Sequence, residues 1–512
     1  MVRTTATLTR LLDVAALIMS ERRIEVVFTA DDGNGAILAA GMREVLAALE
    51  ATVIPWAEAT GGTFDLVLTA SENDDLSGVD APVVFLPHGV GHLKFYPGTS
   101  TVSGLTPARI RDLGTRTTFA LSHPDQIRRL AAISEPAAGN ARVVGDPALG
   151  RMLASSHRAS SYRRGLDAAG RALVVLASTW GPDSLLGSWP DLPERLLAEL
   201  PVDEYRVVAV LHPGIWAHGP WQVRAWWSRA AEYGLRILPP QSGWQAALLG
   251  ASCVMTDFGS LGLYAAALDK PVLLSDRNSS TTVPDSPAGE LARESPRIDP
   301  EKPLRAQIDA VIHAHEPGRY DRLSASAVHA PWRAAERLRA LLYERMRLAE
   351  PAHAAEFPPV PVPAPQPEGP AAMLASADIS DSLVTVTRHP GIAEPGGRHF
   401  RHLVVDQDRA RLDQVSAADI LIVHPEDLAE TAGHFDRRPH IELITARAGP
   451  YTCRLRTRTA EFVLHAAPDH PGLDVTVLAS WAYTRIHRDH RIPAQDRLRL
   501  GERIIEVRAE AR

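Results

Sequence analysis

The 512-residue sequence contains only two cysteines, Cys253 and Cys453, which lie far apart and outside any CxxC or Cys/His spacing. Disulfide frameworks and structural zinc sites need more such residues at regular spacings, so neither is expected. Cys253 stands inside an apolar run, where a thiol behaves as a small buried hydrophobic side chain. The sequence predicts neither a metal site nor another cofactor.

The chain also lacks a long apolar run and an excess of basic residues. Its N-terminal stretch 8–19 is too short to span a bilayer, contains Arg10 and Asp13, and is expected to form an amphipathic helix. The formal net charge is −7, which argues against a nucleic-acid coat or a strongly basic membrane-binding surface. We expect a cytoplasmic protein with no nucleic-acid partner and no integral membrane segment; peripheral membrane contact stays open but is not favoured.

What the chain does have is a repeated alternation of apolar strands and helical stretches. With 45% hydrophobic and 22% charged residues, it is globular in composition and too long for one core. The predicted strands of a first unit, residues 1–155, are 23–28, 51–55, 65–69, 82–87, 117–122 and 141–144. Those of a second unit, residues 156–348, are 172–177, 206–211, 236–238, 252–255 and 272–274, with helices at 221–233, 244–249, 303–313 and 319–347. This rhythm predicts an α/β fold in which two Rossmann-like, doubly wound domains face each other across a ligand cleft.

The remaining third of the chain is of another kind. Residues 349–372 include a proline-rich run, Pro358 to Pro367, which predicts an extended, polyproline-like linker. Residues 373–512 predict an α+β domain of open role, with strands at 451–456, 461–465 and 474–478 and a helical stretch near 409–415. His487, Asp489 and His490 resemble a metal-ligand cluster there, but a solvated, charged turn over 485–491 is the favoured interpretation.

One candidate for chemistry follows a predicted strand of the first unit. His88 and Gly89 come directly after the strand at 82–87, and Lys94 follows shortly after them. A histidine at the tip of a parallel strand faces the cleft, and a neutral imidazole can take a proton from a hydroxyl near neutral pH. Lys94 can pair with a phosphate as a point charge. If His88 stood alone, a loop histidine that caps a turn would be the simpler explanation.

The second unit offers three further strand ends. Two hydroxyls follow the strand at 172–177, His212 follows the strand at 206–211, and the stretch 256–260 opens a helix after the strand at 252–255. Gly259 would let a ligand approach the backbone, Ser260 is expected at the cap, and the free N–H groups of the helix start attract an anion. Ordinary capping explains each element alone, whereas their convergence on His88 predicts a phosphate-binding cleft. The candidate donor-binding residues are Lys94, Ser178, Thr179, Thr256, Asp257, Gly259 and Ser260.

The order and the residue types of these strand ends resemble those of the CDP-glycerol glycerophosphotransferase family of teichoic-acid polymerases and primases. The matching elements are His88-Gly89 with Lys94, Gly145-Asp146-Pro147, Thr179-Trp180, Leu211-His212-Pro213, and residues 256–260 followed by Leu268 to Val272. The motifs cover roughly residues 80–275. For the rest of residues 1–348 the resemblance implies a GT-B fold, and residues 373–512 lie outside it.

In that family, a CDP-linked alditol phosphate is transferred to an acceptor hydroxyl and CMP is released. The resemblance implies that His88 is the base and that His212 binds or polarises the phosphates. It further implies pyrophosphate contacts from Thr179, Ser260 and the helix start that follows. The first unit would then be the acceptor domain and the second the nucleotide donor domain.

Three positions depart from the family pattern. Pro87 stands in place of a tryptophan, Gly181 in place of an arginine, and Gly259 in place of a serine. The lost arginine and hydroxyl weaken an anion site by roughly 1.5 to 3 kcal/mol each, so the site is either re-tuned or inactive. Two alternatives therefore stay open: an NDP-sugar glycosyltransferase or non-hydrolysing sugar-nucleotide epimerase on the same fold, and an inactive GT-B-like binding or scaffold protein.

Overall fold

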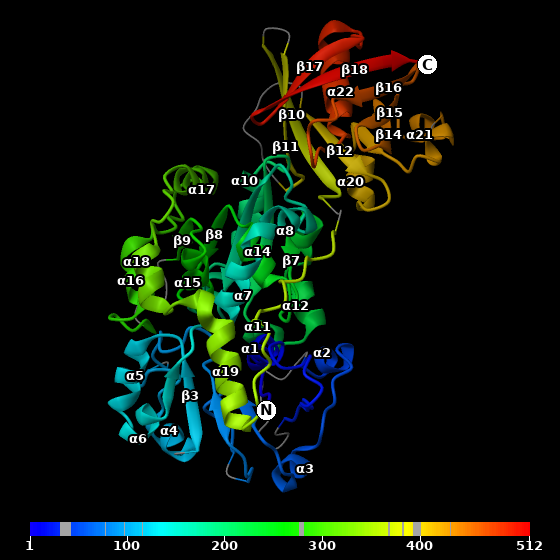
Figure 1. The fold of residues 1–512 in the computed structure, drawn as a ribbon. Helices are drawn as coiled ribbons and strands as arrows, with labels where there is room; N and C mark the ends of the chain where they lie inside the picture. Colours follow the sequence, from blue (N-terminus) through cyan, green and yellow to red (C-terminus); the bar gives the residue numbers. More distant parts are fainter. Residues whose placement is uncertain are drawn as a thin grey trace.

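The structure is a computed structural model that describes residues 1–30, 42–76, 78–96, 98–114, 116–275, 281–366, 369–380, 383–392, 401–430 and 432–512. It contains a four-stranded sheet, a five-stranded sheet and a closed barrel, which follow one another along the molecule (Figure 1). All strand pairs of the first two sheets are parallel. The predicted α/β fold is therefore confirmed.

The first sheet has the order β1-β2-β3-β4 and carries helices on both sides. Its strands are β1 (Val67–Thr69), β2 (Val83–Phe85), β3 (Thr117–Leu121) and β4 (Ala141–Val143). The helices are α1 (Thr5–Ala15), α2 (Met42–Ala48), α3 (Trp56–Gly61), α4 (Pro107–Leu113), α5 (Pro124–Ala131), α6 (Glu135–Gly139) and α7 (Pro147–Ser155). Proline opens several of these helices because its missing N–H would lack a helical partner there anyway.

Two predicted strands of the first unit, 23–28 and 51–55, are wrong. They make only an isolated bridge between Phe28 and Val53. Residues 23–29 and residues 66–68 at the edge of the sheet line the same cavity of about 510 Å³. Among the described residues, no strand pairing joins this segment to β1.

The second sheet has the order β7-β6-β5-β8-β9, with one apolar core on each face. Its strands, near-continuously buried as expected for a parallel sheet, are β5 (Ala172–Ser178), β6 (Tyr205–Leu211), β7 (Arg236–Ile237), β8 (Cys253–Thr256) and β9 (Val272–Leu274). The chain moves outward from β5 through β6 to β7 and then returns to the other side of β5 at β8. Strand order thus reverses between β5 and β8, and in such sheets ligands bind at the carboxyl ends of the two strands that flank this point.

The helices of the second unit are shorter than the sequence predicts in two places. They are α8 (Ala159–Gly165), α9 (Leu185–Ser188), α10 (Leu192–Glu199), α11 (Pro213–Trp216), α12 (Pro220–Trp226), α13 (Ser228–Glu232), α14 (Trp244–Gly250), α15 (Ser260–Ala267), α16 (Pro287–Glu294), α17 (Leu304–His313), α18 (Asp321–Ala327) and α19 (Ala334–Met346), with 3-10 turns η2 (Ser156–Arg158) and η4 (Pro331–Arg333). The single helix expected at 319–347 is broken at Pro331, because proline has no N–H to donate and the preceding Ala330 is left-handed (φ 46°). The helix expected at 221–233 is likewise split into α12 and α13.

Helix α19 returns to the first unit although it follows the second in the chain. Its buried residues Leu338 and Leu342 join Val84 and Leu86 of the β2 region in one apolar core. The two units are therefore joined by this helix as well as by the connection through η2.

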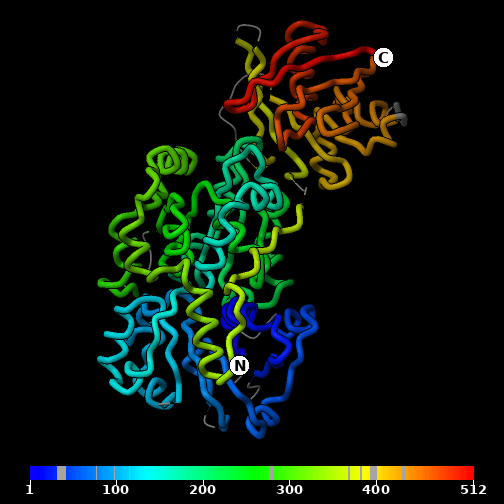
Figure 2. The backbone as a smooth tube through the Cα atoms, in the orientation of Figure 1, coloured from blue at the N-terminus to red at the C-terminus, as the bar shows by residue number. Residues whose placement is uncertain are grey.

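The proline-rich segment 349–366, called the strap here, is extended but not free. Figure 2 shows it running from the end of α19 past the second unit towards the barrel. Val360 is 1% exposed, its N–H donates to Ser155 Oγ at 3.0 Å, and its carbonyl accepts from the Tyr162 hydroxyl at 3.0 Å. Farther along, Arg236 donates to the carbonyl of Ala364 at 2.7 Å. The expected linker is thus a docked segment whose backbone is fixed by side chains of both units.

The C-terminal unit is a closed barrel accompanied by helices, a more specific arrangement than the predicted α+β domain. The strands are β10 (Ala372–Ser380), β11 (Leu383–Pro390), β12 (His402–Asp406), β13 (Ile420–Ile422), β14 (Leu443–Gly449), β15 (Thr452–Arg456), β16 (Glu461–Ala466), β17 (Gln495–Leu500) and β18 (Arg503–Ala511). The helical elements are α20 (Leu412–Ser416), η5 (Asp427–Glu430), α21 (Ala432–Arg437) and α22 (Val477–Asp489). Helix α22 packs against β10, β11, β14 and β16 and buries Trp481 completely.

Two predictions for the C-terminal unit are wrong. The strand expected at 474–478 is the entry to α22, where Asp474 accepts a hydrogen bond from the Thr476 N–H at 3.2 Å and turns the chain. The turn expected at 485–491 is the end of the same helix, in which His487 Nε2 lies 2.7 Å from Glu442 Oε2. Within the described ranges, no group of three or more His, Cys, Asp or Glu side chains is arranged to hold a metal ion.

The barrel is attached at the end of the second sheet that lies away from the first unit (Figure 1). Arg388, which is 1% exposed, forms a bidentate pair with Asp203 at 2.6 and 2.8 Å and also reaches Asp474 at 3.0 Å.

None of the helices among the described residues is long and apolar enough to cross a bilayer.

Candidate active site

The candidate site lies where the carboxyl ends of the two parallel sheets meet. His88 follows β2 and exposes part of its ring to a cavity of about 150 Å³. The cavity walls come mainly from the first unit, with Gly259 and Ser260 contributing from the second. Residues from both units therefore meet around His88, as the sequence predicts.

His88 is electrostatically suited to act as a base. Withdrawal from bulk water, followed by the charge of Arg10, lowers the pKa of its imidazolium, while a hydrogen bond to the backbone of Ala70 and the charge of Glu72 act in the opposite direction. A hydrogen bond that raises the pKa is one in which the ring donates. The second ring nitrogen is therefore left to accept a proton.

The loop that carries His88, residues 87–92, is held through its carbonyl groups. Arg10 donates to the carbonyls of Pro87 at 2.8 Å and Gly89 at 2.5 Å, on either side of the histidine. Gln126 donates to the carbonyls of Val90 at 2.6 Å and Gly91 at 3.4 Å. Such contacts from rigid helices keep a strand-tip residue in one position.

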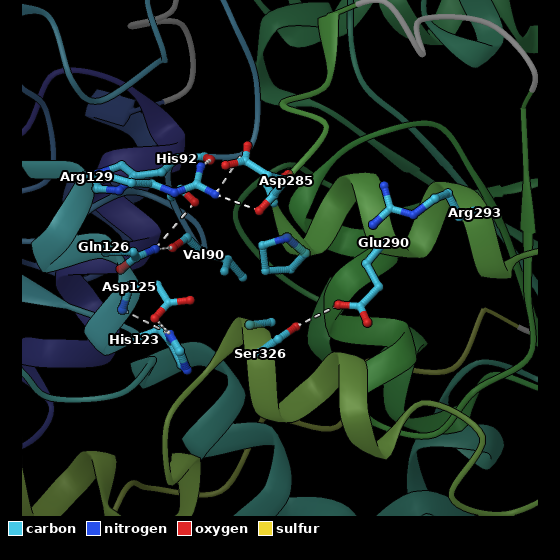
Figure 3. Close-up of a pocket in the computed structure, with 14 residues that line it drawn as sticks. Val90, His92, His123, Asp125, Gln126, Arg129, Asp285, Glu290, Arg293 and Ser326 are labelled. Atoms are coloured by element: carbon cyan, nitrogen blue, oxygen red, sulfur yellow. Dashed lines mark hydrogen bonds and ion pairs between the residues drawn. The ribbon is translucent and has the colours of Figure 1, made fainter. Parts of the chain in front are cut away.

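A second, smaller cavity of about 110 Å³ lies behind this loop, between α5 of the first unit and α16 and α18 of the second. Figure 3 shows that its polar side chains are largely paired with one another. Arg129 donates to the carbonyls of His92 at 3.1 Å and Asp285 at 2.8 Å, and Ser326 donates to Glu290 at 3.1 Å. The polar residues around this cavity therefore join the two units. The bond from Arg129 to the carbonyl of His92 fixes the end of the His88 loop.

Arg10 also connects the loop to the second unit. It pairs with Asp146, the N-cap of α7, at 2.7 Å, and both side chains are at least 95% buried. The same carboxylate oxygen accepts a hydrogen bond at 3.0 Å from Tyr264 of α15. Burial opposes the charge of Arg10, but the neighbouring Asp146 carboxylate raises the pKa of the guanidinium. These contacts thus connect the loop of His88, through Arg10 and Asp146, to Tyr264 of α15.

His212, at the end of β6 in the second unit, has a ring nitrogen that can donate a hydrogen bond. Its Nδ1 accepts the N–H of Gly214 at 3.0 Å, so the proton of the neutral ring resides on Nε2. Burial, and then the nearby His88 and Lys94, lower its pKa to about 3. The exposed indole of Trp180 stacks on the His212 ring, with centroids 6.4 Å apart. A neutral ring with an Nε2–H can donate a hydrogen bond to an oxygen in the cleft.

The start of α15 provides an uncapped helix N-terminus in the cleft. The N-cap is Gly259, which makes no side-chain capping bond, and Ser260 is the first helical residue and not the cap. Ser260 Oγ lies so close to Gly89 that a Cβ at position 89 would clash with it. The free N–H groups of this first turn therefore lie beside the His88 loop, where they favour an anion.

Three predicted donor-binding residues have internal roles instead. Asp257 is fully buried, and its Oδ2 accepts the hydroxyl and the N–H of Thr179, both at 2.9 Å. The Ser178 hydroxyl donates to the carbonyl of Thr179 and accepts a hydrogen bond from the N–H of Leu186. Thr256 is 2% exposed, and its hydroxyl donates to the carbonyl of Asp257. Asp257, Ser178 and Thr256 therefore shape the strand ends. Thr179 is partly exposed, but its N–H and hydroxyl both donate to Asp257, whereas Gly259 lines the cavity beside His88.

Lys94 lies at the junction of the two units. It forms an isolated antiparallel bridge with Thr282 of the second unit, and the adjoining Phe95 donates to the carbonyl of Thr281 at 2.8 Å. Burial lowers the pKa of its ammonium, and the Asp257 carboxylate opposes that shift. This position lets Lys94 meet an anion at the start of α15.

The sequence interpretation found the strand-tip residues and missed the side chains that hold them. Those side chains are Arg10, Gln126, Arg129 and Tyr264, while Asp146 was named as part of the family resemblance without a role. One signal was present for Arg10, because an arginine and an aspartate three residues apart interrupt the apolar stretch 8–19. Charged residues on a buried helix face need partners, although the sequence does not say which.

We predict that the protein loses stability as the pH falls below 6.5, because folding keeps His92 neutral. Burial, and then the charge of Arg129, lower the pKa of His92 from 6.5 to about 3. Below pH 6.5 the unfolded chain therefore binds a proton that the folded protein does not, which costs the folded state about 2 kcal/mol at pH 5. The measurement is the free energy of unfolding in urea at pH 5 and pH 7.5, for the wild type and for His92→Asn. Asparagine tolerates the left-handed backbone of this position (φ 55°).

The same replacement at the exposed His157 is the matched control, and it should retain the pH dependence of the wild type. A His92→Asn protein that loses as much stability at pH 5 as the wild type would show that His92 is not the source.

No family model and no curated protein matches the sequence. The solved structures to which the chain is similar include the wall teichoic acid polymerase TagF in a form soaked with CDPG, with a TM-score of 0.46 and 10% identity over 66% of this chain and 85% of that one. A second TagF structure has a TM-score of 0.45 and 10% identity, covering 65% and 85% of the two chains. Anabaena Alr3699/HepE in complex with UDP and glucose has a TM-score of 0.36 and 13% identity, covering 67% and 92%. Likeness at this level does not assign an activity.

Proposed function

We propose that this protein is a transferase of GT-B architecture that moves an alditol phosphate from a CDP-linked donor to an acceptor hydroxyl and releases CMP. The observation that supports it most is that two neutral imidazoles, those of His88 and His212, lie near each other at the strand ends. His88 is placed to accept a proton and His212 to donate a hydrogen bond, beside an uncapped helix start. The residues expected to act are His88 and His212, with Lys94, Thr179, Gly259 and Ser260 around the phosphates.

The reaction uses these groups in defined roles. The acceptor oxygen attacks the phosphorus that carries the alditol and forms a new P–O bond, and its proton passes to His88. The bond from that phosphorus to the bridging oxygen breaks, so CMP leaves with that oxygen. Phosphoryl transfer of this kind needs positioning and charge stabilisation more than covalent help. The Nε2–H of His212, the Lys94 ammonium and the first turn of α15 supply that stabilisation.

The nucleoside of the donor would extend along the second unit. The exposed Trp180 beside His212 presents a flat aromatic surface near the phosphate position, and aromatic rings stack readily on nucleobases. Gly181 follows it with a positive φ of 93°, where the family pattern has an arginine. The partial positive charge of the helix start offsets part of that missing charge.

The proposal predicts that the protein binds CDP and prefers it to UDP by isothermal titration calorimetry. His212→Gln should retain most of the affinity, because its amide reaches the position of Nε2 and can donate there. His212→Asn should weaken CDP binding by about ten-fold or more, the cost of one charge-assisted hydrogen bond of roughly 1.5 to 3 kcal/mol, although it preserves the acceptor for the Gly214 N–H.

Other outcomes lead to the alternatives. Tighter binding of UDP than of CDP would favour a sugar transferase or a sugar-nucleotide epimerase on the same fold. No binding of either nucleotide would favour an inactive binding protein. CMP release from a panel of CDP-alditols in the presence of polyol acceptors then tests the reaction itself.

A further inference from the structure

A cavity in the first unit, separate from the cleft, has the size of a ligand site. Its volume is about 510 Å³, within the range of roughly 300 to 1,000 Å³ that small-molecule pockets span. Among the described residues, none lines both this cavity and the one beside His88. A ligand bound here would therefore not occupy the cleft.

The cavity is bordered along its length by two segments of the chain. Every residue of 23–29 lines it, and so does every residue of 63–68, which leads into β1. A volume drawn out along two such segments is a channel and not a round hollow. Other apolar side chains complete its walls: Leu11, Ala15, Ile18, Ile54, Trp56, Ala59, Leu76, Val79, Met346 and Leu348.

The inner surface of this channel is apolar. Ile24, Val26, Leu66 and Leu68 remain partly exposed although they pack against an apolar core. The charged side chains of the lining are all exposed, so charge is confined to the mouth: Arg23, Glu25 and Asp65. Internal water is held by several polar partners, which an apolar wall does not supply. Apolar surface is removed from water when a hydrocarbon enters, and this favours binding.

The two long walls are fixed independently of each other. Phe28 donates to the carbonyl of Thr52 at 2.8 Å and accepts from the N–H of Ile54 at 2.9 Å, which holds the segment 23–29 to residues outside β1. On the other wall, β1 is paired with β2 along its whole length. The space between the walls is therefore preformed, as small-molecule sites usually are.

We propose that this channel binds one hydrocarbon chain, the tail of a single-chain amphiphile whose polar head stays at the charged mouth. A flexible chain matches a long apolar channel. A nucleotide or a sugar would bury polar groups there without partners, which is costly. The site does not depend on the proposed transferase reaction and adds a second kind of ligand to the first unit.

The test uses 1-decanol as the ligand and N-phenyl-1-naphthylamine, an uncharged dye that fluoresces in apolar surroundings, as the reporter. The wild type should bind the dye, and decanol should displace it. Val26→Phe places a larger side chain in the channel, because Val26 lines it and is partly exposed. Val53→Phe is the matched control, since Val53 is 53% exposed and outside the lining. We expect Val26→Phe to bind decanol about ten-fold more weakly or worse, and Val53→Phe to bind it as the wild type does.

Thermal unfolding gives a second measurement. Decanol should raise the midpoint of the wild type and of Val53→Phe, because a ligand that binds only the folded chain stabilises it. It should not raise the midpoint of Val26→Phe. Urea denaturation of Val26→Phe, expected to show one transition as in the wild type, establishes that this variant is folded.

Phosphatidylcholine vesicles distinguish the source of the chain. If the wild type sediments with vesicles and Val26→Phe does not, the chain is that of a bilayer lipid; decanol binding without sedimentation identifies a free amphiphile. Failure of decanol to displace the dye, no thermal shift of the wild type, or equal decanol binding by folded Val26→Phe would each overturn the channel. None of these results bears on CDP binding.

Discussion

Replacing His88 by alanine is expected to lower the rate of CMP release from a CDP-alditol by about 10²- to 10⁴-fold, the usual contribution of a positioned general base. The loss should fall on kcat, because the imidazole acts on the proton of the acceptor and not on the binding of the donor. CDP affinity measured by calorimetry should therefore stay within a factor of about two of the wild type. His313→Ala, an exposed histidine on α17, is the matched control and should retain full activity.

The pH profile gives an independent check on the same residue. Because its surroundings and Arg10 lower the pKa of His88 below 6.5, the base stays unprotonated down to mildly acidic pH. Activity should fall as the pH decreases, and the midpoint of that acidic limb should lie below 6.5. Equal CMP release by the wild type and His88→Ala, or a midpoint well above 6.5, would remove His88 from the role of base.

The second large effect is expected at Arg10. Arg10→Met should reduce the free energy of unfolding by about 3 to 5 kcal/mol, because it leaves the Asp146 carboxylate buried without its counter-charge. It also removes the donors to the carbonyls of Pro87 and Gly89. Urea denaturation measures the change. The control is Arg23→Met, which breaks an exposed pair with Glu21 and should leave the transition unchanged.

A structural role alone would not alter the pH profile, and this separates positioning from stability. Arg10→Lys keeps a positive charge near His88 but loses the fork that spans two carbonyls. We expect it to lower kcat while the acidic limb stays in place. In a folded Arg10→Met protein that limb should move upward, because the charge that lowers the pKa of His88 is gone. A Met variant with the stability and pH profile of the wild type would contradict both parts of the argument.

Some elements of the fold and some residues near the site could be predicted from local sequence. The apolar runs of β5, β6 and β8 predict buried parallel strands, and the polar residues directly after them had to lie at one edge of the sheet. His88 and His212 were found in this way. The capping position of Ser260 was not, because Gly259 takes the cap and a shift of one residue is beyond what a turn sequence specifies.

Other elements depended on distant partners. The segment 23–28 has the composition of a strand, but it forms only an isolated bridge from Phe28 to Val53. The segment 474–478 also has the composition of a strand, yet the chain begins α22 there, at Val477. The apolar side chains of α22 pack in one core with those of the barrel strands. The strap was predicted as an extended linker, and only the folded first and second units supply Ser155, Tyr162 and Arg236 to bind its backbone. Composition describes a segment and does not reveal what packs against it.

The amino-acid sequence alone determined that two α/β units succeed each other and that histidines and hydroxyl groups stand at their strand ends, because both follow from periodicities of a few residues. The tertiary structure decided which of those groups face the cleft and which are used inside it. Gly259 and Ser260 line the cavity while Ser178, Asp257 and the two donors of Thr179 are used internally. Arg10, 78 positions before His88 in the numbering, holds the loop of that histidine. Such contacts join residues far apart in the chain, so they exist only once both sheets have formed and met.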